Sequence, residues 1–158
     1  MKRPIPLSVL LVLILGVCSI LSATVSIFVP TDYATLSEAV TWLNSQTINE
    51  NHVIYVSAGH SETITSPILL TASGSEGCSI TIQKYGAGAN PIVTRTDTGS
   101  LSTSTLGGYG DCIIAMNGSD YITWNGIDVV AIEPTIEYGY LTFKPSGTDG
   151  CQHINIKN

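Results

Sequence analysis

The chain has 158 residues, of which 44% are hydrophobic and only 11% are charged. This length allows one domain with its own core and is too short for two ordinary domains. The charged fraction lies far below the roughly 25% of typical soluble domains, and together with 15 glycines it indicates a β-rich extracellular protein. The formal net charge of -6 argues against nucleic acid as a partner, because phosphate binding needs a basic patch.

The N-terminal segment is typical of a secretory signal peptide. Lys2 and Arg3 are followed by an almost wholly apolar run, and Ala23 offers a small residue for cleavage. We therefore expect residues 1–23 to be a signal peptide and residues 24–158 to form an extracellular or cell-surface protein with no membrane span. An uncleaved anchor is the alternative, because the uncharged stretch after Arg3 approaches the ~20 residues that span a bilayer.

One helix is predicted near the start of the mature chain, after a first strand at 27–29. Thr35 and Glu38 have the spacing of a capping box, in which each side chain accepts from a backbone amide of the first turn. Apolar residues then recur at helical spacing on one face. They are Leu36, Ala39, Val40 and Leu43. The pattern predicts a helix of about ten residues over 35–44.

After Asn51 the sequence predicts short strands separated by turn residues, with local alternation of apolar and polar positions. The predicted strand segments are 52–59, 66–72, 78–86, 91–95, 112–118, 121–129, 140–144 and 153–158. Three of them share one outline, in which a glycine and one or two polar residues precede an Ile-polar-apolar triplet that starts at Ile80, Ile122 or Ile154. Unequal intervals between these triplets are tolerated in a repeat fold, where insertions project as loops.

Three segments resemble right-handed parallel β-helix proteins of the pectin-lyase-like superfamily. They are VPTDYATLSEAV at 29–40, SDYITWNGI at 119–127 and CQHINIKN at 151–158. The resemblance implies an all-β fold, a right-handed parallel β-helix or solenoid with a short N-terminal capping α-helix. It implies no chemistry, because enzymes, adhesins and non-enzymes share these motifs. Residues 24–158 would then be the cap and first coils of an incomplete solenoid, and its partners would include further coils of a longer chain.

No constellation of catalytic residues can be assigned. His60 and Glu62 could lie on one side of a strand and serve acid-base chemistry, but a solvated turn is the favoured interpretation. Arg95 is the only arginine after the leader, so the paired aspartates and arginine of pectinesterase-like relatives have no counterpart here. We assign no catalytic, cofactor-binding or metal-binding residue.

No cofactor is predicted, and calcium is retained only as an alternative. Asp111, Asp120 and Asp128 could cluster on adjacent turns to hold calcium, whereas the glycines beside them favour ordinary Asx turns.

The mature chain keeps three cysteines, Cys78, Cys112 and Cys151, and their odd number and wide spacing favour core packing over a disulfide scaffold.

Four tyrosines lie in or beside predicted loops, where exposed rings could stack on sugars or pack against the fold. They are Tyr85, Tyr109, Tyr138 and Tyr140.

Two functions follow as hypotheses. The first is a secreted or cell-surface, non-catalytic scaffold, adhesin-like or contacting polysaccharide or other cell-surface components. The second is the N-terminal fragment of a polysaccharide lyase or glycoside hydrolase whose catalytic coils lie beyond residue 158.

Overall fold

A computed structural model describes residues 23–99 and 110–158. The predicted signal peptide falls almost wholly outside the described residues. The strands of this part of the chain form three sheets, one of five strands and two of three. All pairs of neighbouring strands are parallel. No helix in these residues has the length and apolar character that crossing a membrane requires.

The five-stranded sheet, called sheet A, carries the longest strand ladder. Its strands, in spatial order, are β1 (Thr24–Val29), β2 (Asn51–Ser57), β5 (Ile80–Tyr85), β8 (Ile122–Asn125) and β11 (Asn155–Lys157). Ile80 lies opposite Ile122, and Thr123 lies opposite Asn155. The pairing of the triplets that begin at Ile80, Ile122 and Ile154 is therefore confirmed.

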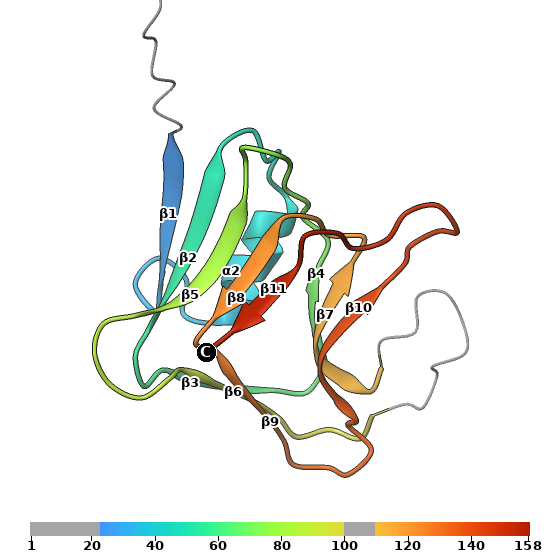
Figure 1. The fold of residues 1–158 in the computed structure, drawn as a ribbon. Coiled ribbons are helices and arrows are strands. Elements are labelled where there is room, and N and C mark those ends of the chain that lie inside the picture. Colours follow the sequence, from blue (N-terminus) through green and yellow to red (C-terminus); the bar gives the residue numbers. More distant parts are fainter. Residues whose placement is uncertain (1–22, 100–109) are drawn as a thin grey trace, which may run out of the picture.

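Two further sheets stand beside sheet A. Sheet B contains β3 (Ser61–Ile64), β6 (Ile92–Arg95) and β9 (Asp128–Ala131). Sheet C contains β4 (Ile68–Leu70), β7 (Cys112–Asn117) and β10 (Tyr138–Phe143). From β2 onward the chain visits sheets A, B and C in turn, and the sheets face a common interior (Figure 1).

The structure corrects the predicted fold class. A single right-handed parallel β-helix was expected, but hydrogen bonding divides the strands among three separate small parallel sheets accompanied by one α-helix. The physical reason lies in the turns between sheets A and B. Gly59, Gly86 and Gly126 each have a positive φ there, between 68° and 87°, which L side chains rarely adopt. The chain bends sharply at these glycines, so the ladder of sheet A ends before sheet B begins.

The core is built from equivalent positions of successive strands. In sheet A the inward column contains Ile27, Ile54, Ile82, Trp124 and Ile156 in register. The three middle side chains have 0% exposure, whereas Ile156, on the last strand, is 48% exposed. Side chains at equivalent positions of neighbouring parallel strands lie one strand spacing apart, so successive members of the column are neighbours in the core.

The predicted helix is confirmed as α2 (Leu36–Asn44). The Thr35 hydroxyl accepts from the Glu38 amide at 3.1 Å, and the Glu38 carboxylate accepts from the Ala34 amide at 3.0 Å. The four residues predicted for the apolar face are the buried ones. The helix lies against β4, so it occupies the edge of sheet C that no strand covers.

The strand predictions differ from the structure in two places. β3 was missed, because the polar Glu62 takes one of its two inward positions and leaves Ile64 as its one apolar residue. The predicted strand at 121–129 is in fact two strands, β8 and β9, in different sheets. Gly126, with a φ of 68°, separates them. Each of the other predicted segments contains a strand.

Truncating the middle of the inward column should destabilise the whole domain. We expect Ile82→Ala to lower the free energy of unfolding by about 2–5 kcal/mol, because it leaves a cavity between Ile54 and Trp124. Thr81→Ala, one residue away on the outward face, is the matched control and should cost less than about 1 kcal/mol. Urea unfolding followed by circular dichroism measures both. Equal effects of the two substitutions would contradict the register described here.

Candidate functional site

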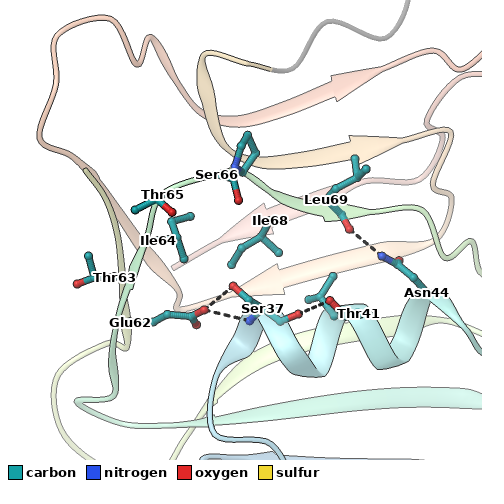
Figure 2. A pocket seen from close by; sticks show the side chains of 12 residues that line it. Ser37, Thr41, Asn44, Glu62, Thr63, Ile64, Thr65, Ser66, Ile68 and Leu69 are labelled. Atoms are coloured by element: carbon teal, nitrogen blue, oxygen red, sulfur yellow. Dashed lines mark hydrogen bonds between the residues drawn. The ribbon is translucent and has the colours of Figure 1, made fainter. Parts of the chain in front are cut away.

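A polar cleft lies between α2 and the segment that carries β3 and β4 (Figure 2). Its volume is about 510 Å³. Most of its side-chain polar groups are hydroxyls, contributed by both walls. The lining residues are Ser37, Val40, Thr41, Asn44, Glu62, Thr63, Ile64, Thr65, Ser66, Pro67, Ile68 and Leu69.

Glu62 is the one carboxylate in the cleft, and its oxygens are occupied by α2. The Leu36 amide donates to Oε2 at 2.8 Å, and the Ser37 amide donates to Oε1 at 3.2 Å. The Ser37 hydroxyl also donates to Oε1 (Figure 2). These amides belong to the first turn of a helix, where the backbone donors lack partners and the helix dipole favours negative charge. Glu62 is only 5% exposed and acts as an anchor for the helix.

Asn44 fastens the other end of α2 to the strand edge. Its side-chain amide donates to the Leu69 carbonyl at 2.7 Å (Figure 2). Its Oδ1 accepts from the Thr71 and Ala72 amides at 2.8 and 3.0 Å. The cleft therefore has one wall fixed at both ends. Its carboxylate and its amide are both committed to the backbone, so the hydroxyls of Thr63, Thr65 and Ser66 remain as the polar groups on the facing wall.

The favoured interpretation of His60 and Glu62 as part of a solvated turn is wrong for Glu62, which lies on β3 and is 5% exposed. The alternative, an acid-base pair, is not formed either. Glu62 points inward and binds α2, and no hydrogen bond joins it to His60 in the described part of the chain. Both carboxylate oxygens of Glu62 already accept hydrogen bonds from α2, so Glu62 is not placed to act as a general base. The arrangement gives His60 no catalytic partner.

The three aspartates considered for calcium lie at different places. Asp111 is buried just before β7, and Asp128 begins β9 in another sheet. Asp120 precedes β8 and accepts from the Gln152 amide at 2.6 Å. Within residues 23–99 and 110–158, no three His, Cys, Asp or Glu side chains gather in a way that could hold a metal ion.

A buried arginine marks the interior between sheets B and C. Arg95 is 2% exposed, its Nε and Nη2 donate to the Asp97 carboxylate at 2.6 and 2.7 Å, and its Nη1 donates to the Cys112 carbonyl. The hydrogen bonds raise the pKa of Arg95 and lower the pKa of Asp97. The sequence showed Arg95 to be a lone arginine, but not that β6 turns it inward between Ile64 and Ala131. The interactions are those of a structural ion pair.

None of the three cysteines within the described residues forms a disulfide. The predicted core packing is confirmed for Cys112, which is buried, while Cys78 and Cys151 are half-buried. Burial raises the pKa of the Cys112 thiol to about 12, so it stays protonated at physiological pH and is a poor nucleophile. The Cys151 thiol donates to the Met116 carbonyl.

An aromatic cluster forms the most distinctive exposed feature of sheet A. Phe28 and Tyr55 stack with ring centroids 5.0 Å apart, and Tyr85 meets both rings edge-on at 5.4 and 5.5 Å. Tyr85 is 54% exposed. All three rings occupy outward positions. Tyr55 lies between two buried residues of β2, and Phe28 is its partner in register on β1. Tyr85 lies two residues after Gln83, the partner of Tyr55 on β5. We call these three residues the aromatic cluster.

Polar side chains continue the cluster across sheet A. The position of Phe28 and Tyr55 is occupied by Gln83, Asn125 and Lys157 on the following strands. Adjacent strands lie about 4.8 Å apart, so this outward row crosses the whole sheet at regular intervals. We call the row, from Phe28 to Lys157, the outward ladder.

The four tyrosines predicted to be near loops have different environments. Tyr85 joins the aromatic cluster, and Tyr138 is 40% exposed on β10. Tyr140 packs edge-on against Trp124 and donates to the Ile127 carbonyl at 2.8 Å, and its burial raises its pKa. Tyr109 lies outside the described residues. Sequence reasoning missed Phe28 and Tyr55 as partners of Tyr85, because only the strand register brings the three together.

No family model, no curated protein and no solved structure matches this chain. The resemblance to pectin-lyase-like proteins therefore stays a prediction, and the function has to be argued from the residues described above.

Removing the charge of Glu62 should loosen α2. We expect Glu62→Gln to lower the free energy of unfolding by about 2 kcal/mol, because hydrogen bonds to a charged group and a favourable helix-dipole interaction are lost together. Glu76→Gln, at an exposed position, is the matched control and should change stability by less than about 0.5 kcal/mol. Hydrogen exchange should locate the loss at the first turn of α2. Unchanged exchange there would contradict the anchoring role.

The pair formed by Arg95 and Asp97 predicts a pH-dependent stability. Asp97 has a lowered pKa in the folded protein, so its contribution is present above about pH 4, near the ordinary Asp pKa, and is lost as the pH falls further. We expect Asp97→Asn to lower the free energy of unfolding at pH 7 by about 1–3 kcal/mol, because the buried Arg95 loses its counter-charge.

The difference between Asp97→Asn and the unaltered protein should shrink when urea unfolding is repeated at decreasing pH below 4. Asp149→Asn, which changes an exposed carboxyl, serves as the control. A difference that is independent of pH would show that the substitution acts through packing and not through charge.

Proposed function

We propose that this chain is a secreted or cell-surface, non-catalytic binding module that contacts carbohydrate through the outer face of sheet A. The observation that carries the proposal is the outer face of sheet A, where the aromatic cluster, with Tyr85 54% exposed and Phe28 and Tyr55 half-buried, is followed along the outward ladder by the amide side chains of Gln83 and Asn125. Aromatic faces stack on the C–H faces of sugar rings, and amides exchange hydrogen bonds with sugar hydroxyls. A linear glycan lying across the strands would meet both kinds of group.

The charge of the protein favours a neutral glycan. The formal net charge is -6, and it becomes -8 when Lys2 and Arg3 leave with a signal peptide. A polyanionic saccharide would be repelled at long range by such a surface. The outward ladder itself carries one charged side chain, Lys157, at its far end. Its other members are neutral.

The commitment of Glu62 supports a binding role without catalysis. Both oxygens of this carboxylate accept hydrogen bonds from α2, so it is not placed to exchange protons with a ligand in the cleft. The hydroxyls of Thr63, Thr65 and Ser66 can bind polar ligands but lack an activating base. The cleft is therefore a second surface suited to contact and not to bond cleavage.

Binding to neutral linear glycans tests the proposal. Calorimetric titration with soluble β-glucan, xylan or mannan oligosaccharides should give saturable binding to at least one of them. We expect Tyr85→Ala to weaken that binding about fivefold to tenfold, which corresponds to about 1–1.4 kcal/mol for the loss of one exposed ring.

Tyr138→Ala is the matched control, because Tyr138 is also an exposed tyrosine but lies on β10 in sheet C. Its removal should leave binding unchanged. Equal losses for the two variants, binding only to acidic glycans, or no binding to any of these neutral glycans would contradict the proposal.

A further inference from the structure

A second hollow lies along α2, beside the loop that joins β1 to the helix. It is an open groove with a volume of about 620 Å³. The groove shares no residue with the outward ladder of sheet A, and we call it the aromatic groove. Its lining residues are Tyr33, Ser37, Glu38, Thr41, Trp42 and Ser45.

Two half-buried rings form the apolar part of the aromatic groove. The ring centroids of Tyr33 and Trp42 are 5.9 Å apart, and the ring planes are tilted by 35°. The ring centroid of Trp42 also lies 6.0 Å from that of the buried His52. Tyr33 and Trp42 pack against the hydrophobic core, so both rings are held in place in the absence of a ligand. The faces of such rings carry negative potential.

The hydroxyl groups of the aromatic groove already use their hydrogens inside the protein. The Thr41 hydroxyl donates to the Ser37 carbonyl at 2.8 Å, and the Ser45 hydroxyl donates to the Trp42 carbonyl at 2.6 Å. The Ser37 hydroxyl donates to the Glu62 carboxylate (Figure 2). A ligand would therefore meet oxygen lone pairs at these three hydroxyls and no hydroxyl donor. This suits a positively charged ligand better than a sugar, which brings acceptors of its own.

The charge of the aromatic groove is negative. Glu38 is its one charged lining residue, and it is exposed. Its Oε2 accepts from the Ala34 amide at 3.0 Å, which leaves Oε1 to face a ligand. The sequence has no lysine or arginine between Arg3 and Lys84, so α2 and its flanking loops carry no basic side chain. Ring faces, lone pairs and a carboxylate together favour a cation.

We propose that the aromatic groove binds a quaternary ammonium ion of the choline type. Such an ion spreads its charge over methyl groups, which pack on the faces of Tyr33 and Trp42 and need no hydrogen-bond partner. Glu38 supplies the opposite charge at the rim of the groove. This site is separate from the glycan-binding face, so the inference does not depend on the function proposed above.

Titration of the full chain with choline chloride tests the inference, with sodium chloride at equal ionic strength as the blank. The chain has two tryptophans, and Trp124 has 0% exposure, so a ligand-dependent change in fluorescence reports on Trp42. We expect saturable binding with a Kd of about 1 mM. The neutral isostere of choline, in which a tert-butyl group replaces the trimethylammonium group, should bind at least about tenfold more weakly because it lacks the charge.

Two substitutions separate the contributions of the ring and of the charge. Tyr33→Leu keeps apolar contact but removes a ring face, and it should weaken choline binding about threefold to tenfold. Glu38→Gln keeps an acceptor for the Ala34 amide but removes the charge, and it should weaken binding about threefold. Tyr138→Leu, at an exposed tyrosine of β10, is the matched control and should leave binding unchanged. Thermal unfolding of each variant shows whether the fold is kept.

Cosedimentation with phosphatidylcholine vesicles identifies the source of the cation. Bound vesicles would support a lipid head group, and binding of choline without vesicle binding would support a soluble ligand. The inference is overturned if choline gives no saturable signal, or if the neutral isostere binds as tightly as choline. It is also overturned if variants that unfold like the parent protein, Tyr33→Leu and Glu38→Gln, both bind choline normally. A neutral methyl glucoside that displaces choline would assign the groove to glycan binding instead.

Discussion

In-register parallel pairing is the constraint on which the rest of this structure depends. Because equivalent residues of successive strands lie side by side, all members of one column of sheet A point to the same side of the sheet. The inward column keeps Ile, Ile and Trp dry, while the outward ladder presents Phe, Tyr, Gln and Asn to the outside. The core and the candidate binding surface thus lie on the two faces of sheet A, and the same strand register determines both. A shift by one residue would exchange them.

Local signals in the sequence were sufficient for some elements and insufficient for others. The capping box and the apolar face predicted α2, and the Ile-polar-apolar triplets predicted which strands of sheet A pair. β3 gave no signal, because its inward Glu62 is polar and is stabilised by a helix 25 residues earlier. The fold class was wrong, since the resemblance described repeated strands but not how the turns at Gly59, Gly86 and Gly126 divide them into sheets.

The candidate site was less predictable than the fold, because it too depends on contacts between residues that are far apart in the sequence. Residue types allowed His60 with Glu62, and three aspartates for calcium, only as alternatives that were not favoured, and the structure gives these side chains separate neighbours. Tyr85 was expected in or beside a loop, with its ring either stacking on sugars or packing against the fold, and its partners Phe28 and Tyr55 come from strands far away in the sequence. In a fold of repeated strands, the neighbours of a polar or aromatic side chain come from adjacent strands, and the sequence alone does not show which residues those are.

The long reach of the strand pairs has a kinetic consequence. Ile27 pairs with Ile54, and Ile80 pairs with Ile122, so the strand pairs of sheet A join segments that are 27 to 42 residues apart. Closing such loops costs conformational entropy before any contact is gained, and folds dominated by these contacts form slowly. α2 is the one helix in the described residues, and its backbone hydrogen bonds join residues that are close in the sequence. The helix can therefore form before the long-range strand pairs. The hydrogen bonds of Glu62 and Asn44 would then dock β3 and β4 against it while the later strands are still unpaired.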